Sequence, residues 1–386
     1  MSNPAPESPP KGNVLIVDDV PVNLRLLSSM LGEQGYKVRS VINGQMALTA
    51  VRAAPPDLIL LDINMPEMNG YQVCEELKAD ETTRDIPVIF ISALDETEDK
   101  VKAFAIGGLD YITKPFQFEE VLARVETHLS LRRLQKQLQD ANRRFEQELA
   151  LAARIQANFL PSPPEVPGWQ VAVALQPARE MSGDFYDINP LPHGRLGFVV
   201  ADVVDKGVGA ALYMALTWIL IRTFAAEYPT QPDRVCDAVN RSMVLETQAS
   251  QFVTTFYGVL DPTSGSLVYA NAGHNPPLFV SAAGGPKAQP LMSTGLPLGV
   301  LDEGSWKQNA IQFAPGDVLV LYTDGITEAQ DVRSTLYGED RLLACVQANL
   351  GRPAPALRDA ILADVRRFTG DAPRLDDVTL VVIARE

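Results

Sequence analysis

A long segment without proline or glycine most constrains how this chain can fold. Neither residue occurs from Phe118 to Phe159, and apolar side chains there recur at helical spacing, so the segment is predicted to form one continuous helix. Prolines at positions 161, 163, 164 and 167 then end the helix, because proline lacks the amide hydrogen that a helix requires. The 386-residue chain therefore has one region before the helix and one after it, each long enough to bury its own core.

Apolar residues recur every seven positions along two seams of this predicted helix. The first seam contains Leu131, Leu138, Phe145, Ala152 and Phe159, and the second contains Leu134, Ala141 and Ile155, with Glu148 as its one break. Such heptads are typical of a short coiled coil, which would join two copies of the chain. A single amphipathic helix packed on one of its own domains is the alternative.

The region before the helix has the pattern of an α/β domain. Almost continuously apolar runs at Asn13–Val17, Asp57–Leu61 and Pro87–Ile91 alternate with amphipathic stretches. Such runs are typical of strands in a doubly wound fold, in which helices cover both faces of a parallel sheet. Ligands of these sheets bind at the carboxyl ends of the strands.

Composition excludes several classes of protein. Apolar residues make up 46% and charged residues 21% of the chain, which is ordinary for a folded globular protein. The net charge of −15 disfavours nucleic-acid binding, because it repels phosphates. The three cysteines, Cys74, Cys236 and Cys345, are far apart and lack metal-ligand spacing, which excludes a disulfide framework and favours the cytoplasm.

No segment predicts export or membrane insertion. The first twelve residues are polar and rich in proline, so they are predicted to be a disordered leader rather than a signal peptide. The longest apolar run, Ala210–Ile221, has twelve residues, fewer than the roughly 20 that span a bilayer. It is therefore predicted to form a buried helix.

Acidic residues directly follow two of the strands predicted before the helix. Asp18 and Asp19 follow the first strand, and Asp62 follows the run that ends at Leu61. Adjacent parallel strands would bring the three carboxylates together, and their repulsion would be relieved by a hard divalent cation, Mg²⁺. Ser92 ends the next strand and Lys114 follows another, so a hydroxyl and a fixed positive charge join a set that can accept a phosphoryl group.

These residues resemble the response-regulator receiver family. The matching segments are VDD at Val17–Asp19, LLDINMPEMNG at Leu60–Gly70, SA at Ser92–Ala93 and YITKPF at Tyr111–Phe116. The resemblance implies that Asp62 accepts the phosphoryl group from a histidine kinase or another phosphodonor. It also implies a Mg²⁺ site formed by Asp18, Asp19, Asp62 and the main-chain carbonyl of Asn64, and a phosphate-sensing set formed by Ser92, Tyr111 and Lys114.

The region after the helix groups its strands and helices separately, which indicates an α+β fold. Strands are predicted at Gly197–Ala201, Phe252–Leu260, Val318–Tyr322 and Val378–Ile383. Helices are predicted at about Val208–Ala226, Pro232–Thr247, Gly338–Leu350 and Ala356–Thr369.

A second set of acids lies at the ends of these strands, at Asp184, Asp202, Asp324 and either Asp376 or Asp377. Carboxylates beside buried strands are costly unless they are paired, protonated or bound to cations. Several carboxylates that share two divalent ions are the usual apparatus for hydrolysing phosphate esters. The set therefore predicts a binuclear metal site that needs no Ser or Cys nucleophile.

This region resembles the metal-dependent type 2C serine/threonine phosphatases, in particular the bacterial subgroup that regulates sigma factors, and so implies a two-sheet sandwich. The matching segments are ARIQANFLP, SGDFYD, ADVVDKGVGAALYMA, FVTTFYGVLD, NAGHNPP, YTDGITEA and DDVTLVV. The resemblance implies that Asp202 bridges two Mn²⁺ or Mg²⁺ ions. Asp184 and the Val203 carbonyl would bind one ion and Asp324 and Asp376 the other, with Asp377 as the substitute for Asp376.

Two positions depart from that pattern, since Ser182 and Asp205 stand where glycine is frequent. Neither change removes an expected ligand. Asp187 and Asp205 are predicted to cap or to form local hydrogen bonds. His274 lies between glycine and proline neighbours in NAGHNPP, which favours a role in shaping its loop over acid–base chemistry.

The predicted organisation is a leader at 1–12, a receiver domain at 13–125, a helical coiled-coil linker at 126–160 and a phosphatase domain at 161–386. The leading hypothesis is a homodimeric cytoplasmic phosphatase that acts on phosphoserine or phosphothreonine of a partner protein under the control of Asp62. By resemblance, the partner is an anti-sigma-factor antagonist. The competing hypothesis is a noncatalytic adaptor, which would be expected to have lost its metal carboxylates. A DNA-binding regulator would require a basic recognition helix that this chain lacks.

Overall fold

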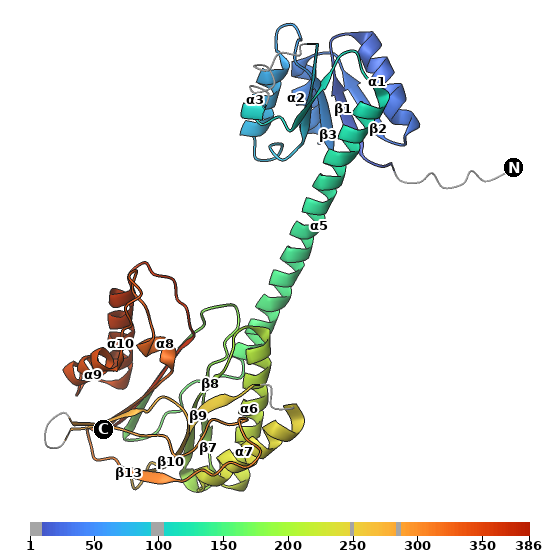
Figure 1. Cartoon of the computed structure of the whole chain (residues 1–386). Coiled ribbons are helices and arrows are strands. Elements are labelled where there is room, and N and C mark those ends of the chain that lie inside the picture. The colour runs from blue at the N-terminus through green and yellow to red at the C-terminus, as the bar shows by residue number, and fades with distance from the viewer. Residues whose placement is uncertain (1–9, 94–103, 248–250, 283–286) are drawn as a thin grey trace. The chain divides into compact units, whose positions relative to one another are not determined.

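The computed structural model describes residues 10–93, 104–247, 251–282 and 287–386. The chain forms two compact units, Met1–Phe145 and Glu146–Glu386 (Figure 1). The boundary lies inside one helix, so the predicted linker at 126–160 is shared between the units, and the predicted limits at 125 and 160 stay predictions. Most of the predicted leader, residues 1–9, lies outside the described residues.

The first unit is an α/β fold around a five-stranded parallel sheet with strand order β2-β1-β3-β4-β5. Its strands are β1 (Asn13–Val17), β2 (Lys37–Val41), β3 (Leu58–Asp62), β4 (Val88–Ser92) and β5 (Asp110–Thr113). Its helices are α1 (Pro21–Glu33), α2 (Gly44–Ala53), α3 (Gly70–Ala79) and α5 (Phe118–Ala157), which continues into the second unit.

Both faces of the central strands are buried, which explains why β1, β3 and β4 are apolar without alternation. Val14 and Ile16 of β1 pack with α1 and α5 on one face, in a cluster that includes Leu27 and Val125. Leu15 and Val17 of the same strand pack with α2 and α3 on the other face. The predicted doubly wound sheet is confirmed.

Helix α5 ends at Ala157 rather than at Phe159, the last residue of the predicted helix. Phe159 lies in the turn that follows, and its ring packs against Trp218 with 5.0 Å between the ring centroids. The nearby proline at position 161 explains the early end, because the segment before a proline leaves helical geometry. Phe159 is thus part of the second unit's core and does not extend the heptad seam.

The second unit contains two five-stranded antiparallel sheets with strand orders β13-β10-β9-β8-β7 and β12-β11-β14-β15-β6. Their strands are β6 (Trp169–Gln176), β7 (Phe185–Pro190), β8 (Leu196–Val203), β9 (Val253–Asp261), β10 (Ser266–Ala272), β11 (Leu278–Ser281), β12 (Lys287–Pro290), β13 (Asn309–Gln312), β14 (Val318–Tyr322) and β15 (Val378–Arg385). The helices are α6 (Val208–Glu227), α7 (Pro232–Thr247), α8 (Asp324–Thr327), α9 (Glu339–Ala348) and α10 (Ala354–Thr369), with a short 3-10 turn, η1, at Pro192–Gly194.

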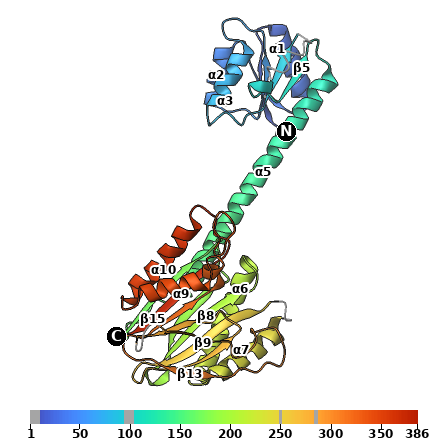
Figure 2. The same cartoon turned by 60° about the vertical axis from the view of Figure 1, so that its left-hand side comes forward.

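The two sheets pack face to face and helices cover their outer faces (Figure 2). Aromatic and aliphatic side chains from both sheets, among them Phe198, Phe256 and Leu319, fill the space between them. Helices α6 and α7 cover the first sheet, and α9 and α10 cover the second. The predicted two-sheet α+β sandwich is confirmed.

Helix α6 contains the apolar run that was predicted to be buried, but only one face of the helix is buried. Ala210, Met214 and Ile221 are buried against the first sheet, whereas Leu212 and Ile219 are exposed. Of the helices within the described ranges, α6 alone has the length and apolar composition that a membrane span needs, and a helix packed on a protein core meets the same two criteria. Its packing on the sheet accounts for the apolar residues of the buried face.

Candidate metal centres

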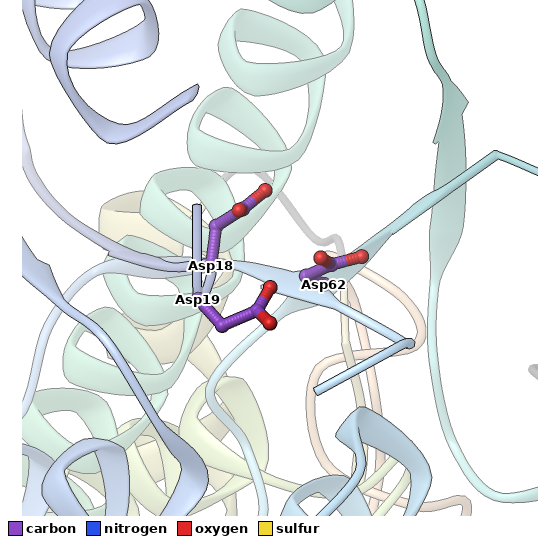
Figure 3. A group of neighbouring side chains, drawn as sticks. All are labelled: Asp18, Asp19 and Asp62. Carbon is purple, nitrogen blue, oxygen red and sulfur yellow. The ribbon is translucent and has the colours of Figure 1, made fainter. Parts of the chain in front are cut away.

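The ends of β1 and β3 bring three carboxylates together in the first unit (Figure 3). Asp18 and Asp19 follow β1, and Asp62 is the last residue of the adjacent parallel strand β3. One oxygen of each carboxylate lies within 4.8 Å of the others, and Asp18 and Asp62 are buried. Across the described residues, no other group of His, Cys, Asp or Glu ligand atoms is as compact. Three crowded carboxylates suit a small hard cation such as Mg²⁺.

Lys114 supplies a positive charge to this group. Its Nζ lies 2.9 Å from Asp18 Oδ2 and 2.8 Å from Asp62 Oδ2. Burial raises the pKa of the Asp62 carboxyl, and the hydrogen bond from Lys114 opposes that effect. Burial lowers the pKa of Lys114, but the bonds that it donates to both carboxylates leave that pKa above its ordinary value. The ammonium is therefore a permanent charge beside the carboxylate predicted to accept phosphate.

The other predicted receiver residues lie around this group. Ser92 is the buried last residue of β4, and the main-chain N–H of Lys114 donates to its carbonyl oxygen at 2.8 Å. The main-chain N–H of Asn64 donates to Asp62 Oδ1 at 3.4 Å. Tyr111 is half-buried on β5, with the Arg124 guanidinium 5.5 Å from its ring centroid. The structure brings Asp62, Ser92 and Lys114 to one end of the sheet, with Tyr111 further along β5.

Two pairs of neighbouring strands assemble the second acid set. Asp184 precedes β7 and lies beside Asp202 of the adjacent strand β8, while Asp324 follows β14 and lies near Asp376, which precedes the adjacent strand β15. The charges of Asp324 and Asp376 both act on Asp202. The four predicted carboxylates therefore belong to one electrostatic cluster, although they spread more widely than the receiver acids.

Two glycines allow the backbone segments of this cluster to approach closely. A Cβ on Gly183 would lie 3.2 Å from the carbonyl oxygen of Val203, which places that predicted ligand beside the loop that leads to Asp184. A Cβ on Gly325 would lie 1.9 Å from the carbonyl oxygen of Asp377. Only glycine fits at that position, which holds the segment after β14 against the segment before β15.

The carboxylates of the second cluster perturb one another strongly. Burial, followed by the charge of Asp324, raises the pKa of Asp202 to about 7. Burial, followed by the charge of Asp202, raises the pKa of Asp184 well above its ordinary value. Burial and the charge of Asp376 raise the pKa of Asp324. The negative charges of these carboxylates are poorly balanced by nearby positive groups. Mg²⁺ and Mn²⁺ bind such oxygen ligands, so the residues fit the predicted cations.

Two threonines that the sequence interpretation missed hold Asp184 in place. The hydroxyls of Thr323 and Thr379 donate to Asp184 Oδ2 at 2.6 and 2.8 Å. Both threonines are fully buried. They stand beside the predicted acids in YTDG and DDVT, and that adjacency is the signal that could have identified them.

Asp377 forms hydrogen bonds with a loop of the protein. Its carboxylate accepts hydrogen bonds from the main-chain N–H of Ala178 at 2.7 Å, from the Ser182 hydroxyl at 2.8 Å and from the Gly183 N–H at 2.9 Å. These bonds fix the loop that precedes Asp184. They favour Asp376 over its substitute Asp377 as the metal ligand, and they explain why a serine is accommodated at position 182.

The end of α5 is fastened to the same loop. The Gln156 side chain is buried, donates to the Ser182 carbonyl at 2.6 Å and accepts from the Ser182 N–H at 3.0 Å. Because Ser182 is two residues from Asp184, the linker helix and the acid cluster share one hydrogen-bonded loop. Sequence reasoning placed this glutamine inside a matching motif without assigning it a role.

The remaining predicted polar residues have structural partners. Asp187 is buried and accepts the predicted local hydrogen bond, from the N–H of Ile188 at 3.0 Å, and it also accepts two 2.7 Å hydrogen bonds from Arg222 of α6. Asp205 forms the predicted local bond, accepting from the N–H of Lys206 at 2.8 Å. His274 is buried with Nδ1 2.9 Å from the Thr254 hydroxyl, and burial lowers its pKa to about 4. A neutral, enclosed imidazole suits a loop-shaping role.

A cavity of about 430 Å³ opens beside the second cluster. Its wall includes Gly325 and Asp376 of the cluster region, and Arg366 and Arg374 lie further along it. Among the four predicted acids, Asp376 lines this cavity, so the cavity adjoins the cluster on the side of the segment before β15.

The sequence matches two family models. Residues 192–386 match stage II sporulation protein E (SpoIIE), and residues 14–126 match the response regulator receiver domain. Both resemblances drawn from the sequence motifs are thereby confirmed.

Curated relatives match part of their length. Protein IcfG of Synechocystis is 33% identical over 267 residues, which is 62% of this chain and 41% of that protein. The DNA-binding dual master transcriptional regulator RpaA of Synechocystis is 42% identical over 116 residues, which is 30% of this chain and 48% of that protein. The chain thus spans less than half the length of these curated relatives.

Two solved structures resemble the second unit. The SiaA-PP2C domain of Pseudomonas aeruginosa aligns over 64% of this chain and 98% of its own, with a TM-score of 0.57 and 21% identity, which supports the fold alone. The RsbU and RsbW domains of Rv1364c from Mycobacterium tuberculosis align over 58% of this chain and 61% of their own, with a TM-score of 0.50 and 31% identity. The SpoIIE match covers half of the chain, and the chain therefore belongs to the SpoIIE family, with a response regulator receiver domain preceding a PP2C-type phosphatase domain.

Proposed function

We propose that this protein is a two-component response regulator whose output is metal-dependent removal of phosphate from serine or threonine of a partner protein. Phosphorylation of Asp62 by a histidine kinase or another phosphodonor controls that output. The proposed partner is an anti-sigma-factor antagonist in the cytoplasm, in keeping with the sigma-factor-regulating phosphatases that the motifs resemble.

The gathering of Asp184, Asp202, Asp324 and Asp376 into one cluster carries the proposal, and burial together with mutual repulsion raises the pKa of the first three. Asp202 would contact both of two Mn²⁺ or Mg²⁺ ions, with Asp184 and the Val203 carbonyl on one side and Asp324 and Asp376 on the other. When bound, such a pair of ions activates water and neutralises phosphoryl oxygens. The protein's contribution is to hold the carboxylates in place through Thr323, Thr379 and Asp377.

A hydrolysis assay tests this assignment. Asp202→Asn in the full chain should abolish Mn²⁺-dependent release of phosphate from a phosphoserine peptide, because no carboxylate would then bridge the two positions. Asp302→Asn, at an exposed aspartate outside the cluster, should leave the rate unchanged. Undiminished hydrolysis by the Asp202 variant would refute the assignment, and a wild-type protein that binds a partner without hydrolysis would favour the adaptor.

The receiver is proposed to set the phosphatase rate. Asp62 lies beside Lys114 and two further carboxylates, the arrangement that a phosphoacceptor with Mg²⁺ requires. The expected result is that a small-molecule phosphodonor changes the hydrolysis rate of the wild type and leaves that of Asp62→Ala unchanged. An equal response of both proteins would remove the regulatory claim.

Dimerisation through α5 is also proposed. Leu131, Leu134, Leu138 and Phe145 are exposed on this helix, with between 51% and 63% of each residue accessible. Four large apolar residues in heptad positions that face solvent in a single chain match the seam of a parallel coiled coil. A second copy of the chain would bury them.

A further inference from the structure

Lys206 in the loop between β8 and α6 places a positive charge at the acid cluster of the second unit. Its Nζ lies 2.9 Å from Asp376 Oδ2 and donates a 2.6 Å hydrogen bond to the carbonyl oxygen of Leu375. Within the described ranges, no other lysine or arginine forms an ion pair with Asp184, Asp202, Asp324 or Asp376. The cluster therefore has one fixed cation of its own.

The backbone on both sides of Lys206 directs the side chain. Asp205 has φ of 81° and Gly207 has φ of 86°, values in the left-handed region that non-glycine residues seldom adopt. The carboxylate of Asp205 accepts from the Lys206 N–H at 2.8 Å. The fixed turn, with its strained Asp205, holds Lys206 over Asp376.

Lys206 is open to a ligand. Its side chain is 35% exposed, and an ammonium has three N–H donors, of which Asp376 and Leu375 engage two. Both of these partners line the 430 Å³ cavity beside the cluster. A third donor is therefore available beside two residues that line the cavity.

The receiver of the same chain shows the corresponding arrangement. Lys114 Nζ contacts Asp18 and Asp62 at 2.9 and 2.8 Å, as Lys206 contacts Asp376. In both sites a lysine accompanies carboxylates that suit a divalent cation, and a phosphoryl group brought there carries up to two negative charges that a fixed ammonium attracts.

We propose that Lys206 binds the phosphoryl group of the substrate, donating a charge-assisted hydrogen bond to one of its non-bridging oxygens. This inference rests on the proposed phosphatase function and extends it to a substrate-contacting residue outside the carboxylate set. The lysine acts as a fixed cation and transfers no proton.

Three binding and kinetic measurements on the full-length protein test this role. Mn²⁺ binding is measured by calorimetry, inorganic phosphate binding is measured on the Mn²⁺-loaded protein, and kcat/KM is measured with a phosphoserine peptide. Lys206→Gln should weaken phosphate binding at least about tenfold, because a charged hydrogen bond is lost, while Mn²⁺ affinity stays within about twofold. Lys206→Arg should retain most of the phosphate affinity, since it keeps the charge.

Lys307→Gln is the matched control, because Lys307 is exposed and forms no ion pair among the described residues. Unchanged phosphate affinity in Lys206→Gln would overturn the inference. So would a parallel loss of Mn²⁺ and phosphate affinity in both Lys206 variants, since the lysine would then only order the segment around Asp376. If the wild type fails to hydrolyse the peptide while Lys206→Gln still loses phosphate binding, the proposed activity falls and the phosphate contact stands.

Discussion

Replacing Gln156 with alanine tests whether the end of α5 controls the acid cluster. The glutamine side chain makes two hydrogen bonds to the main chain of Ser182, at 2.6 and 3.0 Å, in a buried position. Ser182 also donates its hydroxyl to Asp377, and Asp184 follows two residues later. Alanine would release the loop from the helix and leave two main-chain groups of Ser182 without their partners.

The size of the effect follows from these contacts. Each such bond contributes about 0.5–1.5 kcal/mol net, and a buried group left unpaired costs about 1–3 kcal/mol. Two bonds therefore favour the ordered loop by about 3 kcal/mol, which is roughly 150-fold in the ratio of ordered to displaced loop. Gln156→Glu should destabilise the ordered loop by a similar amount, because a carboxylate oxygen would face the Ser182 carbonyl in place of an N–H donor.

Mn²⁺ affinity by calorimetry and kcat/KM for a phosphoserine peptide measure the outcome. Both should fall at least tenfold in Gln156→Ala, since Asp184 is held through this loop. Gln147→Ala provides the control, because Gln147 is an exposed glutamine on the same helix. If Gln156→Ala binds Mn²⁺ and hydrolyses the peptide within twofold of the wild type, the helix does not act through Ser182 and the coupling argument fails.

Three further predictions concern stability, pH and assembly. Asp202→Asn should stabilise the metal-free protein at pH 8 by up to about 4 kcal/mol, because the pKa of Asp202 is raised to about 7 and its ionised form is therefore disfavoured in the folded state. Urea unfolding in EDTA should show this gain shrinking towards pH 5, where Asp202 of the folded wild type is protonated and no longer carries the buried charge. His274 has a folded pKa of about 4, below its unfolded value, so its contribution to stability is complete above about pH 6.5 and falls by about 2 kcal/mol at pH 5. Urea unfolding of His274→Asn should not show that loss of stability. An equal loss in the wild type and the variant would contradict this prediction. Leu138→Glu should shift sedimentation from dimer to monomer without lowering the unfolding temperature, since Leu138 is exposed in the single chain. Gln139→Glu adds the same charge outside the heptad seam, so this control variant should remain dimeric.

Local sequence signals predicted the parts of the fold that depend on neighbouring residues. The apolar runs before Asp18 and Asp62 identified two adjacent parallel strands, and adjacency of strand ends then placed both acids at one edge. The helix from Phe118 was recognised because a segment free of proline and glycine has few alternatives to helix. In each case the signal for the element lay in residues close together in the chain.

Contacts between distant segments had no such signal. Gln156 and Ser182 are 26 residues apart, and Asp377 reaches Ser182 across 195 residues. The choice of Asp376 over Asp377 as the metal ligand came from family resemblance alone, and the hydrogen bonds from the 178–183 loop to Asp377 give a structural reason for it. Periodicity also misplaced Phe159, whose packing on Trp218 depends on the tertiary fold.

Helix α5 belongs to both units and contains 40 residues, so it is about 60 Å long and each residue adds about 100° of rotation. Inserting two residues in its exposed middle would turn one end by roughly 200° against the other, whereas inserting seven would restore the angle to within about 20°. If the receiver controls the hydrolysis rate by rotating α5, that control should persist after the seven-residue insertion and be lost after the two-residue insertion. The length of α5 should accordingly differ between natural relatives by multiples of seven residues.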